Sequence, residues 1–131
     1  MEAPEEKKEQ AVPVQEQQKE QTVPLYATIE DYQKLGLKVA EIVTAEQIKG
    51  SRRLVQMLVD LGVERRTLVA GIAEAYKPEE LIGRQIVVVT NLKPAKLMGV
   101  ESNGMLLAAS LDGRPILLSL PEKVPNGTIV K

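Results

Sequence analysis

The sequence predicts an all-β fold, a small barrel of short strands accompanied by two short helices. Three observations lead to this prediction. Apolar and β-branched residues recur in short runs between glycine, asparagine and proline turn signals, as in proteins built from short strands. The stretches with a helical pattern are brief, and each ends near a glycine, Gly36 or Gly83. The 131 residues are enough for one domain with a modest core.

The first ordered element is expected to be a helix that begins after Thr28 and runs to about Leu35. The residues Thr28-Ile29-Glu30-Asp31 fit a loose capping box with Thr28 as the N-cap, and Gly36 is a natural C-terminal stop. Ile29, Tyr32 and Leu35 fall on one side of this helix by their three-residue spacing. The helix therefore has an apolar face.

From Leu37 onward the pattern becomes one of strands and turns. The expected elements, in order, are strands at Leu37–Ile48, Leu54–Leu61 and Thr67–Ile72, a short helical connection at Ala73–Leu81, and strands at Gln85–Thr90, Gly104–Leu111, Ile116–Leu120 and Gly127–Val130. Asp112-Gly113 is a hairpin signal between two of these strands. The prediction is a five-stranded OB-fold barrel with a short N-terminal helix and a short helix between strands 3 and 4.

The N-terminal residues differ from the rest in composition. Residues 1–24 are rich in Glu, Gln, Lys and Pro and hold no aromatic residue, so they are predicted to be a disordered acidic linker before a domain at 25–131. They carry three lysines and six glutamates, which leaves 14 basic and 12 acidic residues, a net charge of +2, in the remainder. That excess is too small to indicate nucleic-acid binding unless the cations are clustered.

Composition excludes several functions. The chain has no cysteine and no histidine, so disulfides, thiol nucleophiles, Cys/His zinc sites and histidine acid–base catalysis are ruled out. No nucleophile–base pair, phosphate-binding glycine loop or metal cluster is present, and Glu79-Glu80 suits a helix start better than catalysis. We therefore expect no catalytic residue, metal or cofactor. The absence of cysteine, a secretory signal and a membrane span fits a cytoplasmic location.

One segment, Asn91 to Met105, is unlike an ordinary loop. It carries two lysines, two amide side chains, one hydroxyl and two methionines between two apolar strands. The string Asn-Leu-Lys-Pro-Ala-Lys-Leu-x-Gly-Val-x-Ser-x-Gly-Met resembles the signature of a tRNA-binding OB-fold domain. That domain occurs at the C-terminus or as the β subunit of methionyl-tRNA synthetases and as free-standing tRNA-binding proteins. Matches at Tyr32–Ile42, Val69–Ile72 and Pro78–Gly83 extend the resemblance over about Thr28 to Lys131.

The resemblance implies a non-catalytic dimer that grips the outer corner of tRNA by its shape and raises tRNA affinity for aminoacylation. Lysines and amides supply phosphate and 2′-hydroxyl contacts with little base readout, which agrees with that mode. The residues that match the family's loop contacts are Asn91, Lys93, Lys96, Ser102 and Met105. The implied partners are tRNA, a second copy of the chain and a synthetase catalytic chain, with no membrane.

Two departures from the family pattern concern positive charge. Met98 stands where many members have arginine, so one cationic contact is expected to be missing. In the first turn, Lys49 to Leu54, Arg53 takes the place of a frequent lysine and Arg52 adds a charge. The two arginines are predicted to offset the loss at Met98 by forming a second basic wall of the site.

Each of these residues also has a plainer interpretation. Lys93 and Lys96 could be solvated loop lysines, Arg52 and Arg53 a soluble rim, Ser102 a turn residue, Met105 a core residue and Asn91 a brace for the loop backbone. Arg65-Arg66 is expected to be a solvated hairpin end, with a second phosphate patch as the less favoured interpretation.

The dimer interface is expected on the helix face formed by Ile29, Tyr32 and Leu35 and in the C-terminal segment at Val124 and Val130. The alternative function is a free-standing tRNA-binding or chaperone-like dimeric OB-fold protein. An exposed apolar groove with little basic surface would favour the chaperone-like form.

Overall fold

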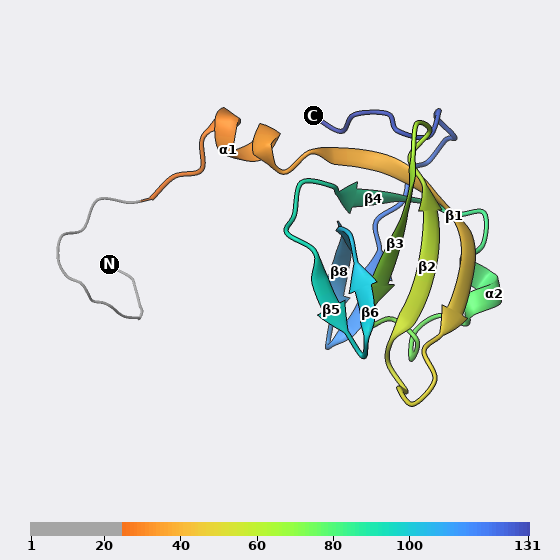
Figure 1. Ribbon diagram of the computed structural model, residues 1–131. Helices are drawn as coiled ribbons and strands as arrows, with labels where there is room; N and C mark the ends of the chain where they lie inside the picture. The colour runs from red at the N-terminus through yellow and green to blue at the C-terminus, as the bar shows by residue number, and fades with distance from the viewer. Residues whose placement is uncertain (1–24) are drawn as a thin grey trace, which may run out of the picture.

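An antiparallel sheet of five strands curls into a nearly closed barrel, as the computed structural model of residues 25–131 shows (Figure 1). The predicted linker at residues 1–24 lies outside the described residues. The elements in chain order are α1 (Ile29–Lys34), β1 (Leu37–Gln47), β2 (Val55–Asp60), β3 (Arg65–Ala70), α2 (Pro78–Leu81), β4 (Gln85–Val89), β5 (Ala95–Leu97), β6 (Val100–Ser102), β7 (Met105–Leu106), β8 (Ala108–Leu111) and β9 (Arg114–Leu117).

The strand order β3-β2-β1-β4-β7, with α2 between β3 and β4, confirms the predicted OB-like barrel. The long strand β1 pairs with β4 through its first half and with β2 through its second half, and the register shifts between Ile42 and Thr44. Such a bulge bends a strand, which lets β1 take part in both sides of the barrel. The seam opposite β1 is closed by the Asn103 amide, which donates to the Thr67 carbonyl over 2.8 Å.

The barrel interior is filled by alternate residues of the strands. Along β2, buried and half-buried positions alternate without exception, and Val55, Met57 and Val59 are fully buried. Helix α2 lies beside β1 (Figure 1) and adds Leu81, which is also fully buried in the same cluster. Neither helix within residues 25–131 is long and apolar enough to cross a membrane.

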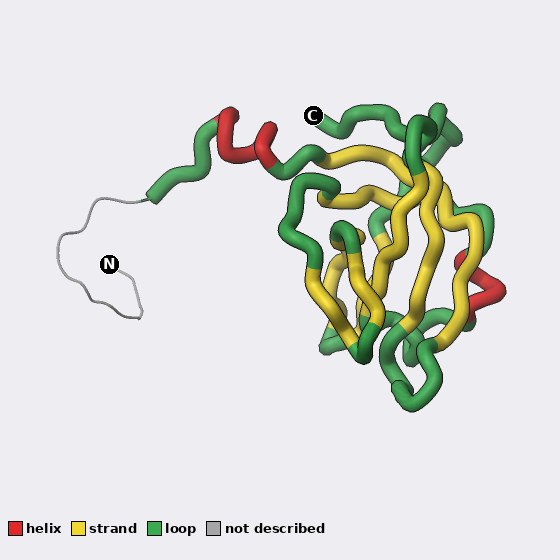
Figure 2. Tube along the Cα trace, in the orientation of Figure 1, coloured by secondary structure: helices red, strands yellow, loops and turns green. Residues whose placement is uncertain are grey.

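Helix α1 forms as the sequence predicts. Thr28 Oγ1 accepts from the Asp31 amide at 3.1 Å, and an Asp31 carboxylate oxygen accepts from the Thr28 amide at 2.9 Å, which completes the capping box. Gly36, with φ of +60°, ends the helix. No residue of α1 is buried, and the helix projects from the barrel (Figure 2).

The observed boundaries differ from the sequence prediction in several places. The expected strand at Gly104–Leu111 is divided into β7 and β8, which belong to different sheets. Only Pro78–Leu81 of the expected helix is helical, because a residue before proline disfavours helical dihedrals. Strand β3 begins two residues earlier than expected, since Arg65 pairs with Asp60. The predicted strand at Ile116–Leu120 is instead β9, shifted toward the two-residue turn at Asp112-Gly113.

A further difference concerns the C-terminal segment. Gly127–Val130 runs beside the start of β1 but forms only an isolated bridge between Ile129 and Lys38. The Thr128 amide donates back to the Pro125 carbonyl, so the segment begins as a turn and cannot extend the ladder. It still covers one edge of the barrel, where the Val39 amide donates to the Thr128 carbonyl at 2.9 Å.

Candidate nucleic-acid interface

The segment from Asn91 to Met105 contains a hairpin, not the continuous loop that the sequence suggested. Strands β5 and β6 pair through Leu97 and Val100, and the connecting residues Met98 and Gly99 have φ of 51° and 79°. Positive φ at both central residues is the conformation of a tight hairpin turn whose twist suits the strands. The hairpin lies against one side of the barrel (Figure 1).

Lys93 and Lys96 are both exposed, as a role in phosphate binding requires. Lys93 precedes β5, and Lys96 lies within it, directly opposite Glu101 of β6. Side chains in such cross-strand pairs are close enough to interact. Glu101 therefore lowers the local positive potential at Lys96, and the site needs further cations to attract a polyanion strongly.

The first turn supplies those cations. Arg52 and Arg53 are exposed at the end of a turn held by Ser51, whose hydroxyl accepts from the amides of Arg53 and Leu54 at 3.2 and 3.1 Å. The prediction that this turn lies beside the hairpin is supported by Met98. A β-carbon placed on Gly50 would lie 3.7 Å from Met98 Cε, so the turn and the hairpin tip adjoin.

Met98, where the family often has arginine, is 57% exposed at the hairpin tip. Its thioether side chain fills the gap toward Gly50 and adds no charge. The cations within three residues of Gly50 or Met98 are Lys49, Arg52 and Arg53 of the first turn and Lys96 of β5. That the arginines offset the missing cation stays a prediction.

Asn91 acts as a brace. Its side-chain amide donates to the Lys34 carbonyl at 2.6 Å, and its backbone amide donates to the Leu35 carbonyl at 3.2 Å. The residue thus satisfies two carbonyls at the C-terminal end of α1, which the helix itself leaves without partners. This is the structural role that the sequence left open.

Ser102 is 5% exposed and faces the barrel seam. Its hydroxyl accepts from the Val69 amide of β3 at 3.0 Å and donates to the Gly104 carbonyl at 3.1 Å. Both capacities of the hydroxyl are used inside the protein, so its placement favours a role in fixing the hairpin base over direct contact with a ligand. Met105 is 51% exposed, which contradicts the plainer interpretation as a core residue, and the contact with tRNA stays a prediction.

Arg66 is the residue whose importance the sequence did not reveal. The interpretation of Arg65-Arg66 as a solvated hairpin end is wrong for Arg66, whose side chain is only 23% exposed and donates to the Thr90 carbonyl at 2.6 Å. Arg65 is more exposed, at 57%, and its guanidinium lies 3.9 Å from Asp60. A signal for Arg66 was absent because its partner is 24 residues away in sequence.

The predicted interface residues do not form one cluster. The Tyr32 hydroxyl donates to the Val130 carbonyl at 3.3 Å, and both residues line an apolar groove of about 320 Å³ between α1, β1 and the C-terminal segment. Ile29 and Leu35 are 65% and 40% exposed. Val124 lies elsewhere, bonded through its backbone to Gln85 at the start of β4, the far end of the β1–β4 ladder from Leu37.

The barrel with its exposed cations on one hairpin and on the adjoining turn defines the class as an OB-fold domain that binds nucleic acid. The particular family follows from comparison with known proteins. A family model described as a putative tRNA binding domain matches residues 37–129, and the chain belongs to that family.

Relatives agree with this assignment. The chain is 50% identical over 103 residues, 79% of its length, to a methionine–tRNA ligase of Archaeoglobus fulgidus, of which the match covers 16%. A MetRS-related protein of Pyrococcus horikoshii has a similar structure, with a TM-score of 0.77 and 43% identity, over 83% of this chain and all of that one. The chaperone CsaA of Bacillus anthracis is also similar, with a TM-score of 0.74 and 30% identity, over 82% of this chain and all of that one. The family is a binding domain and not a catalytic one.

Proposed function

We propose that this domain binds tRNA by its shape and serves methionyl-tRNA synthetase, as its C-terminal domain or as a β subunit, by raising tRNA affinity for aminoacylation. The observation that carries the proposal is the juxtaposition of the hairpin with Lys93 and Lys96 and the turn with Arg52 and Arg53. The chain spans 16% of the length of the ligase it matches, so the catalytic partner belongs to the proposal. A cytoplasmic location follows from it.

Tyrosine exposure supports recognition of shape over recognition of bases. Of the three tyrosines, all within the described residues, only Tyr26 is largely exposed, at 82%. Tyr32 is bonded to Val130, and the Tyr76 hydroxyl accepts from the Leu117 amide at 3.1 Å. Base stacking on aromatic rings is the usual means of holding single-stranded bases. With one free ring, contacts to phosphate and 2′-hydroxyl groups remain as the main source of affinity.

A titration with unfractionated tRNA at several salt concentrations tests the proposal. We expect binding at low salt whose logarithmic association constant falls linearly with the logarithm of salt concentration, because each phosphate contact releases condensed counterions. Different tRNAs should bind with similar affinity, and a single-stranded oligonucleotide should bind more weakly. Absence of binding at low salt would contradict the proposal.

Dimerisation is the second part of the proposal. Helix α1 has six residues, too few to be stable alone in water, and it exposes Ile29 on an apolar face. A second copy that packs against α1 and the apolar groove beside Val130 would bury this face. Pairing would also double the cationic surface presented to one tRNA.

We expect the chain to sediment as a dimer at micromolar concentration and the Ile29→Asp variant to sediment as a monomer, because a carboxylate at a buried interface lacks a partner. Ile82→Asp is the matched control, since Ile82 is 53% exposed beside α2, away from α1 (Figure 1). That control should remain dimeric. Wild-type protein that sediments only as a monomer would contradict this part of the proposal.

A chaperone-like role is the second candidate, and one observation favours it beyond the similarity to CsaA. An apolar groove of about 440 Å³ lies between the end of β3 and β7, lined mainly by Val69–Ile72, Met105–Ala108 and Pro115. The basic turn and hairpin argue for tRNA as the main ligand. If the protein bound an unfolded polypeptide and failed to bind tRNA, the chaperone-like role would become the leading candidate.

A further inference from the structure

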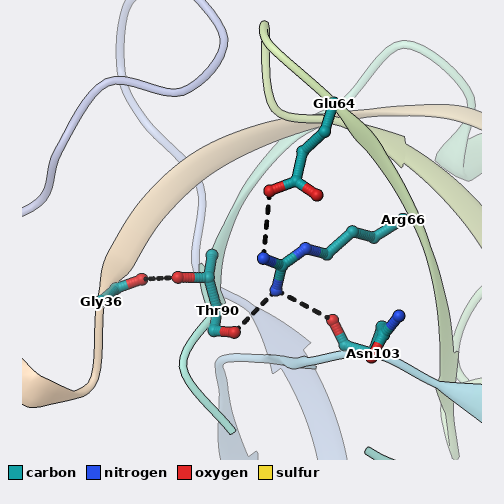
Figure 3. Close-up of polar contacts among 5 residues, drawn as sticks. All are labelled: Gly36, Glu64, Arg66, Thr90 and Asn103. Carbon is teal, nitrogen blue, oxygen red and sulfur yellow. Dashed lines mark hydrogen bonds and ion pairs between the residues drawn. The ribbon is translucent and has the colours of Figure 1, made fainter.

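The guanidinium of Arg66 joins the two ends of the segment from Asn91 to Met105, the proposed tRNA-binding segment (Figure 3). One nitrogen, Nη1, donates to the carbonyl of Thr90 at 2.6 Å, just before the segment begins, and more weakly at 3.4 Å to the carbonyl of Asn103, where it ends. The other nitrogen, Nη2, donates to Glu64 at 3.0 Å. The side chain thus reaches from β3 to the residue that follows β4 and to the residue that follows β6.

Both carbonyls lie outside the strand ladders, so no neighbouring strand supplies them with a donor. Strand β4 pairs with β7 only through Val88 and Val89, so Thr90 has already left the sheet. Asn103 lies between β6 and β7, and its amide is used at the seam with Thr67. Thr90 is half-buried, so its carbonyl has less access to water, and a charged donor forms the stronger kind of hydrogen bond. Asn103 is exposed, and its bond to Arg66 is the longer one. Arg66 therefore connects the two ends of the segment at its base, and we call the hydrogen bonds of Arg66 to Thr90, Asn103 and Glu64 the strap.

Glu64 holds the guanidinium in place from the other side. The hydrogen bond from Arg66, reinforced by its charge, keeps the pKa of the Glu64 carboxyl below its ordinary value. Glu64 is in the turn between β2 and β3, whose backbone is closed by the Leu61 amide donating to the Glu64 carbonyl at 2.8 Å. The strap is thus anchored in a tight hairpin of the barrel and not in a free loop.

The same joint continues to helix α1. The Thr90 hydroxyl donates to the Gly36 carbonyl at 2.6 Å (Figure 3), and the Thr90 amide donates to the same carbonyl at 3.1 Å. A β-carbon on Gly36 would lie 2.6 Å from Thr90 Oγ1, so only glycine allows this approach. Arg66, Thr90 and Gly36 therefore form one connected set of bonds.

We propose that Arg66 is a positioning residue for tRNA binding: it holds the β5–β6 hairpin, which carries Lys96 and follows Lys93, at the angle that brings its tip beside the turn of Arg52 and Arg53. This inference rests on the proposed function. The Arg66 guanidinium donates to Thr90, Asn103 and Glu64 inside the protein and is not proposed to contact phosphate. It differs in this respect from the exposed lysines and arginines of the site.

The first test compares Arg66→Met with Arg65→Met. Both variants remove one arginine from the same strand, but Arg65 is exposed and has only a distant pair with Asp60. In the free protein, amide hydrogen exchange at β5, β6 and Asn103 should quicken about tenfold or more in Arg66→Met and be unchanged in Arg65→Met. The amides of β1 and β2 should exchange as in the wild type, which shows that the barrel remains folded.

The second test uses tRNA affinity in a double-mutant cycle. Arg66→Met should lower affinity about tenfold in the wild-type background and by less than about twofold when Lys93 and Lys96 are already alanine, because it acts through them. A direct phosphate contact by Arg66 would instead give independent, additive losses. Additive losses, or unchanged exchange in the hairpin, would overturn the proposal.

Arg66→Lys covers the case in which Arg66→Met does not fold. Lysine keeps the charge and one point donor but cannot serve Glu64 and both carbonyls with a planar fork, so we expect intermediate exchange and intermediate affinity. Wild-type exchange in Arg66→Lys would also contradict the strap. If wild-type protein does not bind tRNA at all, the proposed function fails, while the exchange experiment still decides whether Arg66 holds the hairpin.

Discussion

Replacing Lys93 and Lys96 together by alanine is expected to weaken tRNA binding by about 10- to 100-fold at low salt, about 1.4–2.8 kcal/mol for the pair. A hydrogen bond to a charged group contributes roughly 1.5–3 kcal/mol, and the exposure of both lysines reduces this through solvent screening. The loss should be similar for many tRNAs, because phosphate contacts carry no sequence information. The slope of log association constant against log salt should become shallower by about one for each lysine that contacts phosphate. Filter binding over a range of salt concentrations measures both quantities.

Two comparisons make this result specific. Arg53→Ala should give a smaller loss of the same kind, because the turn keeps Arg52 and Lys49. Lys123→Ala is the matched control, an exposed lysine beside the barrel end lined by Gly83–Gln85. It should leave affinity unchanged. An unaltered slope in the double-lysine variant would show that the hairpin is not the contact surface.

Leu81→Ala is expected to lower the free energy of unfolding by about 2–5 kcal/mol, the usual cost of truncating a fully buried leucine. Leu81 is the only buried residue of α2, and it joins the core cluster with Met57 and Ile86. The cavity left behind would lie at the place where the helix between β3 and β4 meets the barrel. For a domain of this size the melting temperature should fall by roughly 10 °C or more.

Urea unfolding at fixed protein concentration measures the effect, with Ile82→Ala as the matched control. Ile82 is the next residue and is 53% exposed, so its truncation should change stability by no more than about 0.5 kcal/mol. Fixed concentration matters because a dimer gains stability by mass action. Equal losses in the two variants would contradict the assignment of Leu81 to the barrel core.

Local sequence signals predicted the local structure of this chain well. The capping box at Thr28, the glycine stop at Gly36 and the Asp112-Gly113 turn all depend on residues that are close in sequence, and the structure has each of them. The barrel order followed from the number of strands and the place of the helix. These features are set by backbone preference, which can be read from a few neighbouring residues.

The β5–β6 hairpin escaped prediction for a physical reason. Its turn, Met98-Gly99, lacks the Asn-Gly or Asp-Gly pair that usually signals positive φ at both positions. Its strands have three residues each, and all of β5 is exposed, so the alternation of apolar and polar residues is lost. Contacts with the barrel fix this hairpin.

The exposure of the cations named from the sequence is confirmed, and the supporting roles of Asn91 and Ser102 were among the alternatives, whereas the role of Arg66 was not predicted. Lys93, Lys96, Arg52 and Arg53 lie on the surface, as charged side chains generally do. The bonds made by Ser102 and Arg66 instead join residues that lie 33, 24 and 37 positions apart in the sequence. A single sequence carries no signal for such pairs, since they exist only once the barrel has closed.

Near Gly36, the end of α1 is joined by hydrogen bonds to the residues that precede the β5–β6 hairpin. The amides of Asn91 and the hydroxyl of Thr90 donate to three consecutive carbonyls at the end of α1, those of Lys34, Leu35 and Gly36. A second subunit packed on α1 and a tRNA seated on the hairpin would both stiffen this short stretch of backbone. By thermodynamic reciprocity, the factor by which pairing of subunits tightens tRNA binding must equal the factor by which tRNA tightens pairing of subunits. Subunit dissociation constants measured with and without tRNA would give that factor directly.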